Sequence, residues 1–155
     1  MTTQNNLIPQ SIFLLEPPYN SRSQELTAGI AAYCQKHQLG MLETIEFTNP
    51  FDHENLRKLV KLVIAKEVKP VTVIINGLSI YESINKILLT VLGTLELSEL
   101  IKISTYSVTK NSIVLRHLNN EEHDLIAKAM IFAEQYGFDE WKRFESIYHR
   151  AEASN

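Results

Sequence analysis

The side chains that can do chemistry gather in two short polar stretches, each directly after an apolar run. Residues 16–23 offer a carboxylate, an amide, hydroxyls and a guanidinium, and residues 76–81 offer an amide and hydroxyls. A serine hydroxyl can act as a nucleophile, and an arginine beside it can stabilise a developing anion. Ser21 and Ser23 with Arg22 are therefore the candidates for catalysis, and the competing interpretation is that Ser21 caps a helix while Arg22 is solvated. The other polar side chains are candidates for a ligand-binding crevice: Glu16, Tyr19, Asn20, Asn76, Ser79 and Tyr81.

Both polar stretches follow segments that have the sequences of strands. Residues 11–15 (SIFLL) and 71–75 (VTVII) are apolar, as is typical of parallel strands buried on both faces. Further strands are predicted at residues 41–47, 100–105 and 112–115, the last one short enough for a sheet edge.

Helical spacing of apolar residues appears between these strands. Helices are predicted to begin near Ser23, at Asp52, at Tyr81 and at Asn120, with a last helix from Asp139. Gly40 is expected to end the first of them in the left-handed conformation, and Gly137 to end the fourth.

The alternation of strands and helices predicts a three-layer α/β fold of the flavodoxin-like type. We expect a mainly parallel sheet of four or five strands in the order 2-1-3-4, followed by two C-terminal helices. The chain of 155 residues is expected to form one domain, with a frayed terminus at residues 1–10, an α/β core at 11–118 and helices at 119–155. Strands one and three are then neighbours, so the two polar stretches face each other across the point where the strand order reverses.

Charge is unevenly distributed along the chain. The net charge of −3 argues against general electrostatic adhesion to nucleic acid. Residues 121–155 hold 4 Lys/Arg against 8 Asp/Glu, so the acidity lies in the last segment. The helix from Asp52 has a basic side formed by Arg57, Lys58, Lys61 and Lys66, for which a solvated surface and a nucleic-acid contact are the two interpretations.

Several kinds of site and location are not expected. One cysteine, Cys34, on an apolar helix face indicates a buried structural thiol, and no glycine-rich phosphate loop occurs, so no cofactor is expected. The histidines are scattered without metal-ligand spacing: His37, His53, His117, His123 and His149. No apolar run approaches the roughly 20 residues of a membrane span, and the chain has no basic-then-apolar leader, so we expect a cytoplasmic protein without membrane contact.

Three segments together carry a resemblance to a known family. They are Ile30-x-x-Tyr33-Cys34, DHENLRKLVKLV from Asp52 and VTVIINGLSIYES from Val71. In pattern and spacing, residues 11 to 106 resemble the N-terminal catalytic domain of serine recombinases of the resolvase/invertase type. The resemblance implies an α/β fold, a serine nucleophile on the first loop and arginines around the scissile phosphate.

The chain differs from that family at the positions of the family's catalytic residues. The first strand of such recombinases ends in aromatic-x-Arg-x-Ser, whereas residues 14–18 read LLEPP, so that Glu16 takes the place of the arginine and Pro18 that of the serine. After the third strand the family has Asp-Arg-Leu-x-Arg, whereas residues 76–80 read NGLSI and keep only the leucine. Loss of one group that stabilises the anion costs on the order of a hundredfold in rate.

The leading hypothesis is therefore a catalytically inactive resolvase-like domain that acts by binding. Its expected partners are further copies of itself, DNA or a recombinase. One alternative is a divergent active recombinase that uses Ser21 or Ser23 with Arg22. The other is a flavodoxin-like protein that binds a small molecule in the crevice between the two polar stretches.

Overall fold

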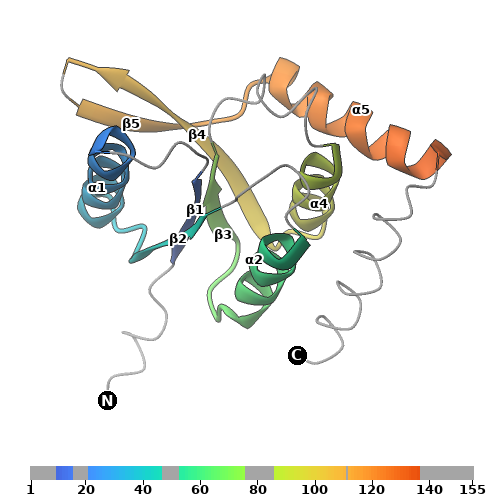
Figure 1. Cartoon of the computed structure of the whole chain (residues 1–155), viewed down its shortest axis with the longest axis horizontal. Helices are drawn as coiled ribbons and strands as arrows, with labels where there is room; N and C mark the ends of the chain where they lie inside the picture. Colours follow the sequence, from blue (N-terminus) through green and yellow to red (C-terminus); the bar gives the residue numbers. More distant parts are fainter. Residues whose placement is uncertain (1–9, 16–20, 47–52, 76–85, 111, 137–155) are drawn as a thin grey trace.

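The computed structural model describes residues 10–15, 21–46, 53–75, 86–110 and 112–136. Strands and helices alternate through the first two thirds of the chain (Figure 1). In chain order the elements are β1 (Ser11–Leu15), α1 (Ser21–Lys36), β2 (Leu42–Glu46), α2 (His53–Ala65), β3 (Val71–Ile74), α4 (Lys86–Leu97), β4 (Ile101–Thr109), β5 (Ser112–His117) and α5 (Asn120–Tyr136).

The five strands form one sheet in the order β2-β1-β3-β4-β5. β1 pairs in parallel with β2 and β3, β3 pairs in parallel with β4, and only β5 runs antiparallel to its neighbour. The predicted α/β class and the strand order 2-1-3-4 are therefore confirmed, with β5 at the edge as expected. Residues 1–9, 16–20 and 76–85 lie outside the described residues, as does the helix predicted from Asp139.

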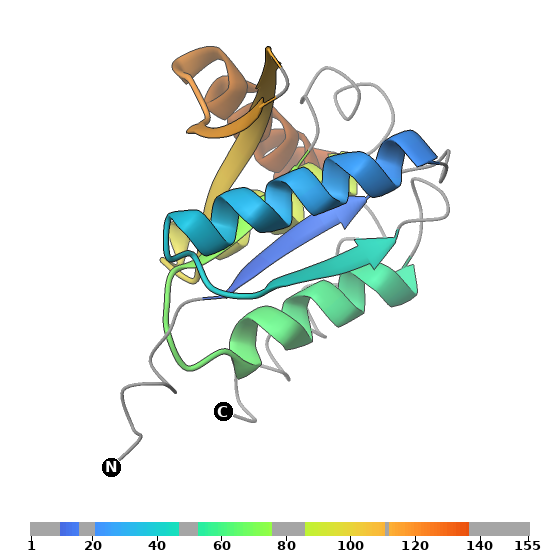
Figure 2. The same ribbon diagram turned by 90° about the vertical axis from the view of Figure 1, so that its left-hand side faces the viewer.

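Helices cover both faces of the sheet. α1 lies on one face and α2 and α4 on the other, and α5 packs on α4 (Figure 2). The alternation of side chains along each strand feeds two separate apolar clusters. On β1, Ile12 and Leu14 join the larger cluster with α2, α4 and α5, while Phe13 joins Ile30 and Cys34 of α1.

β3 is largely buried, as is β1. Val71, Val73 and Ile75 face the larger cluster and Ile74 faces α1, and each of these four side chains is fully buried. This arrangement confirms that the apolar run marks a central strand with both faces covered.

β4 and β5 are longer than their sequences predict. Only Ile101–Ser104 of β4 pair with β3, and the rest of the strand pairs with β5 alone. The two strands therefore continue as a hairpin past the other strands, next to α1 (Figure 1). Their β-branched residues, such as Thr105, Val108 and Val114, favour this extension.

The first helix ends differently from the prediction. The left-handed residue that closes α1 is Gln38, with a φ of 58°, and the amide of Leu39 donates to the carbonyl of Cys34 at 2.7 Å. That i to i−5 bond is the mark of a Schellman cap, so Gln38 takes the cap position that we expected of Gly40. Gly40 has a φ of 80° two residues later, in the turn to β2. α4 closes in the same way, with Glu99 at a φ of 61° and the amide of Leu100 bonded to the carbonyl of Leu95.

Within the described part of the chain, no helix is both long and apolar enough to cross a membrane.

Replacement of Gln38 by glycine should stabilise the protein. A left-handed non-glycine residue costs about 1–2 kcal/mol, while the extra freedom of glycine in the unfolded chain costs about 0.4–1 kcal/mol. We expect the free energy of unfolding of Gln38→Gly to rise by roughly 0.5–1 kcal/mol in urea denaturation. Ala32→Gly, an exposed position inside α1, is the control and should lose about 1 kcal/mol. Equal losses in both variants would contradict the role given to Gln38.

Replacement of Gly93 by alanine should destabilise the contact between α4 and α5. A Cβ atom at Gly93 would lie 2.7 Å from Cγ2 of Ile126 and would also collide with Sδ of Met130. Overpacking costs about 1–3 kcal/mol, which outweighs the gain in helix propensity of about 1 kcal/mol. We expect a net loss of about 1 kcal/mol that becomes smaller in a Met130→Ala background, measured as a double-mutant cycle. A gain in stability on Gly93→Ala would show that the helices do not need this close approach.

Candidate functional site

The predicted crevice lies at the carboxyl ends of β1 and β3. These strands are parallel neighbours, with Ser11 beside Thr72 and Phe13 beside Ile74, so their ends meet at the same edge of the sheet. The crevice residues themselves lie outside the described residues: Glu16, Tyr19, Asn20, Asn76, Ser79 and Tyr81. The structure thus brings the two strand ends together, and the ligand-binding role of the loops stays a prediction.

The candidate catalytic residues occupy the first turn of α1. The helix begins at Ser21, two residues before the predicted start, so Ser21, Arg22 and Ser23 are helical. Of the three, only Ser23 has a described side chain, which is half-buried, and its carbonyl accepts a hydrogen bond from Oγ1 of Thr27 at 2.8 Å. Their catalytic role stays a prediction as well.

The described residues carry a different candidate, a cationic surface on α2. Arg57, Lys58 and Lys61 are exposed, whereas the opposite side of the helix is buried in the larger apolar cluster through Leu56, Leu59, Val60 and Val63. We call Arg57, Lys58 and Lys61 the α2 cations. They make no ion pair with any other described residue. Their charge is therefore open to a partner in solution.

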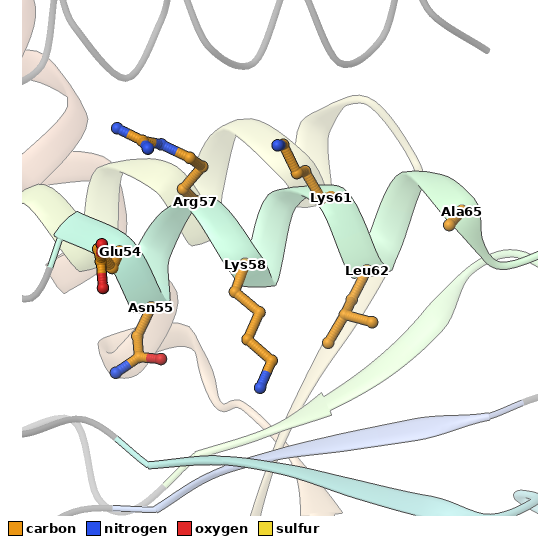
Figure 3. Close-up of a pocket in the computed structure, with 7 residues that line it drawn as sticks. All are labelled: Glu54, Asn55, Arg57, Lys58, Lys61, Leu62 and Ala65. Atoms are coloured by element: carbon orange, nitrogen blue, oxygen red, sulfur yellow. The ribbon is translucent and has the colours of Figure 1, made fainter.

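The α2 cations line a shallow pocket on the outer side of the helix. On the exposed side of α2, Arg57 and Lys61 point toward one edge, and Lys58 and Leu62 point toward the other edge (Figure 3). All of the described lining comes from this one helix: Glu54, Asn55, Arg57, Lys58, Lys61, Leu62 and Ala65. The sequence analysis identified the three cations but not Leu62 and Ala65, which the spacing of four residues from Lys58 to Leu62 and from Lys61 to Ala65 would have placed beside them.

Two contacts fix α2 against the edge strand β2. Nδ2 of Asn55 donates to the carbonyl of Glu46 at 2.6 Å at the start of the helix. Just after its end, Nζ of Lys66 pairs with the carboxylate of Glu43. Lys66 was predicted to belong to the exposed basic side, and this is wrong: only 13% of its side chain is exposed and its charge is matched by Glu43. The cationic surface is therefore the three residues Arg57, Lys58 and Lys61.

The single cysteine is buried, as predicted. Cys34 is fully covered, its pKa is raised by burial, and a hydrogen bond with Ser11 opposes that shift. A thiol in this setting is a poor nucleophile because its thiolate is disfavoured. Among the described residues no group of three or more His, Cys, Asp or Glu side chains is placed to hold a metal ion.

A second charged region lies at the start of α5. Both nitrogens at the end of Arg116 bond to the carboxylate of Glu122, at 2.7 and 3.1 Å. Glu122 and Asn119 also cap the helix reciprocally, since each backbone amide donates to the other residue's side chain at 2.9 Å. The Arg116 guanidinium, as the main cause, holds the pKa of the Glu122 carboxyl below its usual range. These bonds join the end of β5 to α5.

In comparisons with known proteins, no family model, no curated protein and no solved structure matches this chain. What the α2 cations can do is therefore argued from their own chemistry and placement.

Replacement of Glu122 by glutamine should destabilise the protein in a pH-dependent way. A carboxyl whose pKa is lowered in the folded state stabilises above its unfolded pKa, and this contribution disappears as the pH falls through the folded pKa. We expect Glu122→Gln to cost about 1 kcal/mol at about pH 7 and much less at about pH 3, measured as thermal unfolding. Glu121→Gln, an exposed neighbour in the same helical turn, is the matched control and should show a smaller difference. A cost for Glu122→Gln that does not change with pH would contradict the assignment.

Proposed function

We propose that this chain is a catalytically inactive, resolvase-like domain that acts by binding, and that the α2 cations contact the phosphate backbone of DNA. The observation that carries the proposal is the set of three exposed cations on one helix, free of ion pairs with any described residue. Lysine and arginine on one helix side neutralise phosphates and release the counterions condensed on DNA. The expected contact is thus independent of base sequence.

The small number of cations sets the character of the binding. Neutralisation of about three phosphates of duplex DNA predicts a slope of about −3 when the logarithm of the binding constant is plotted against the logarithm of the salt concentration. With a net charge of −3, the rest of the molecule repels DNA at low salt. The domain is accordingly a weak binder that needs a second contribution for high affinity, from a recombinase partner.

Absence of catalysis is proposed from the sequence of the two loops. A phosphodiester transfer needs a nucleophile and a fixed positive charge at the developing anion. The positions that resemble the family's arginine and serine hold Glu16 and Pro18, and the matching stretch after β3 has no arginine. A negative charge at such a position disfavours the transition state instead of stabilising it.

Neutralisation of the α2 cations should abolish DNA binding by the isolated protein. We expect Arg57→Gln/Lys58→Gln/Lys61→Gln to weaken binding of a duplex at least tenfold and to reduce the salt slope by about 3, measured by fluorescence anisotropy over a series of salt concentrations. The matched control is Lys36→Gln/Lys102→Gln/Lys110→Gln, which removes three exposed cations from α1, β4 and the hairpin turn. Equal losses in the two triple variants would contradict a site on α2.

The same preparation tests the catalytic half of the proposal. Incubation with supercoiled DNA should leave the plasmid uncut and give no covalent protein–DNA species after denaturation. A covalent species that disappears in Ser21→Ala/Ser23→Ala would instead establish the divergent recombinase.

A further inference from the structure

α5 presents a second charged stripe whose spacing matches the exposed side of α2. Glu121, Asp124 and Lys128 are exposed and separated by three and four residues, so they lie on one side of the helix. We call these three residues the α5 stripe. None of them forms an ion pair with another described residue. Their charge, like that of the α2 cations, is available to a partner.

The order of charges makes the two helices complementary in one direction only. Read backwards, the α5 stripe is Lys128, Asp124 and Glu121, with separations of four and three residues. On α2, Glu54, Lys58 and Lys61 have the same separations and the opposite charges. Each set spans about 10.5 Å of helix axis, so all three pairs align when the helices are antiparallel.

The parallel arrangement is unfavourable for the same reason. It would place Glu54 beside Glu121 and Lys61 beside Lys128, two pairs of like charges. The order of the charges therefore favours the antiparallel arrangement of the two helices over the parallel one.

The surface of α2 also offers apolar contact to such a helix. Leu62 and Ala65 belong to the same shallow pocket as the α2 cations (Figure 3). Apolar contact matters because exposed ion pairs stabilise only weakly and are screened by salt. The expected association is thus modest in strength and sensitive to salt.

We infer that the α2 surface of one molecule binds the α5 stripe of a second copy, with the helices antiparallel. The fold allows the contact to be made twice. In each molecule α4 and α5 run antiparallel, since Gly93 lies against Ile126 and Glu96 lies against His123. α2 and α4 both run opposite to the parallel strands, so α2 and α5 have opposite directions within one chain. A symmetric dimer would make the contact twice, once through the α2 surface of each molecule.

The dimer contact uses Lys58 and Lys61, two of the three cations of the proposed DNA contact. The acidic part of the α5 stripe occupies the place that phosphates take, so self-association lowers the number of α2 surfaces open to DNA. The dimer itself does not depend on DNA binding. The competition between the two does rest on the proposed function.

Charge reversal with complementation tests the dimer. Lys58→Glu/Lys61→Glu and Glu121→Lys/Asp124→Lys should each weaken self-association at least tenfold at low salt, measured by sedimentation equilibrium. An equimolar mixture of the two variants should recover a heterodimer. At one contact the reversed α2 charges meet the reversed α5 charges, and at the other contact both surfaces keep their original charges. Glu25→Lys/Glu134→Lys, which reverses two exposed acids away from the α5 stripe, is the control and should associate like the unmodified protein.

The outcomes separate the dimer from DNA binding. A protein that stays monomeric at low salt and high concentration, or a mixture of variants that stays monomeric while each is folded by circular dichroism, overturns the dimer. Glu121→Lys/Asp124→Lys should bind duplex DNA at least as tightly as the unmodified protein, because it frees the α2 cations. If the dimer forms but this variant and the unmodified protein both fail to bind DNA, the dimer stands and the proposed function falls.

Discussion

The pairing of β3 between β1 and β4 is the constraint on which the rest of the structure depends. Both faces of β3 are apolar and buried, so burial alone does not distinguish one register from a register slipped by one residue. Backbone bonds at the two ends of the strand decide it: the amide of Val71 donates to the carbonyl of Leu100, and the amide of Ile75 donates to that of Ser104, both at 2.9 Å. With β3 held in this register, β1 is fixed on its other side, and the carboxyl ends of both strands come to one edge.

Features that depend on local pattern could be predicted from the sequence. The apolar run at residues 71–75 and the alternation of strands with helices were sufficient for the class and the strand order, because a strand buried on both faces needs helices on both sides. Features that depend on tertiary contacts could not be predicted in the same way. The hairpin of β4 and β5 extends past the other strands because each strand pairs with the other and because Ile113 packs against Gly29 of α1. Neither fact can be read from a window of adjacent residues.

The two residues whose roles were predicted wrongly, Gly40 and Lys66, have the same physical explanation. Gly40 and Gln38 both have a positive φ, yet it is Gln38 that closes α1, because the burial of Cys34 and the hydrogen bonds of Leu39 fix where the helix must end. Lys66 follows the helical spacing of the basic side but lies just past the end of α2, where Glu43 of β2 is within reach. The conformational preference of a residue and the helical spacing of charges affect stability only weakly. Tertiary contacts override both of them. The exposure of the α2 cations was predicted correctly because no other described residue forms an ion pair with them.

On α2, the residues that stabilise the fold and the charges that we propose for binding lie on opposite sides of the helix. Its inner side contributes four fully buried residues to the larger cluster, and its ends are fixed to β2 through Asn55 and Lys66. The outer side is then held in place without contributing to the core, so its charges can change at little cost in packing. The same division holds for α5, where Ile126, Ala129 and Ala133 are buried and the stripe faces outward. The net charge of −3 is thus the sum of unlike surfaces, among them the α2 cations and the α5 stripe, and we expect these surfaces rather than the net value to govern what the domain attracts.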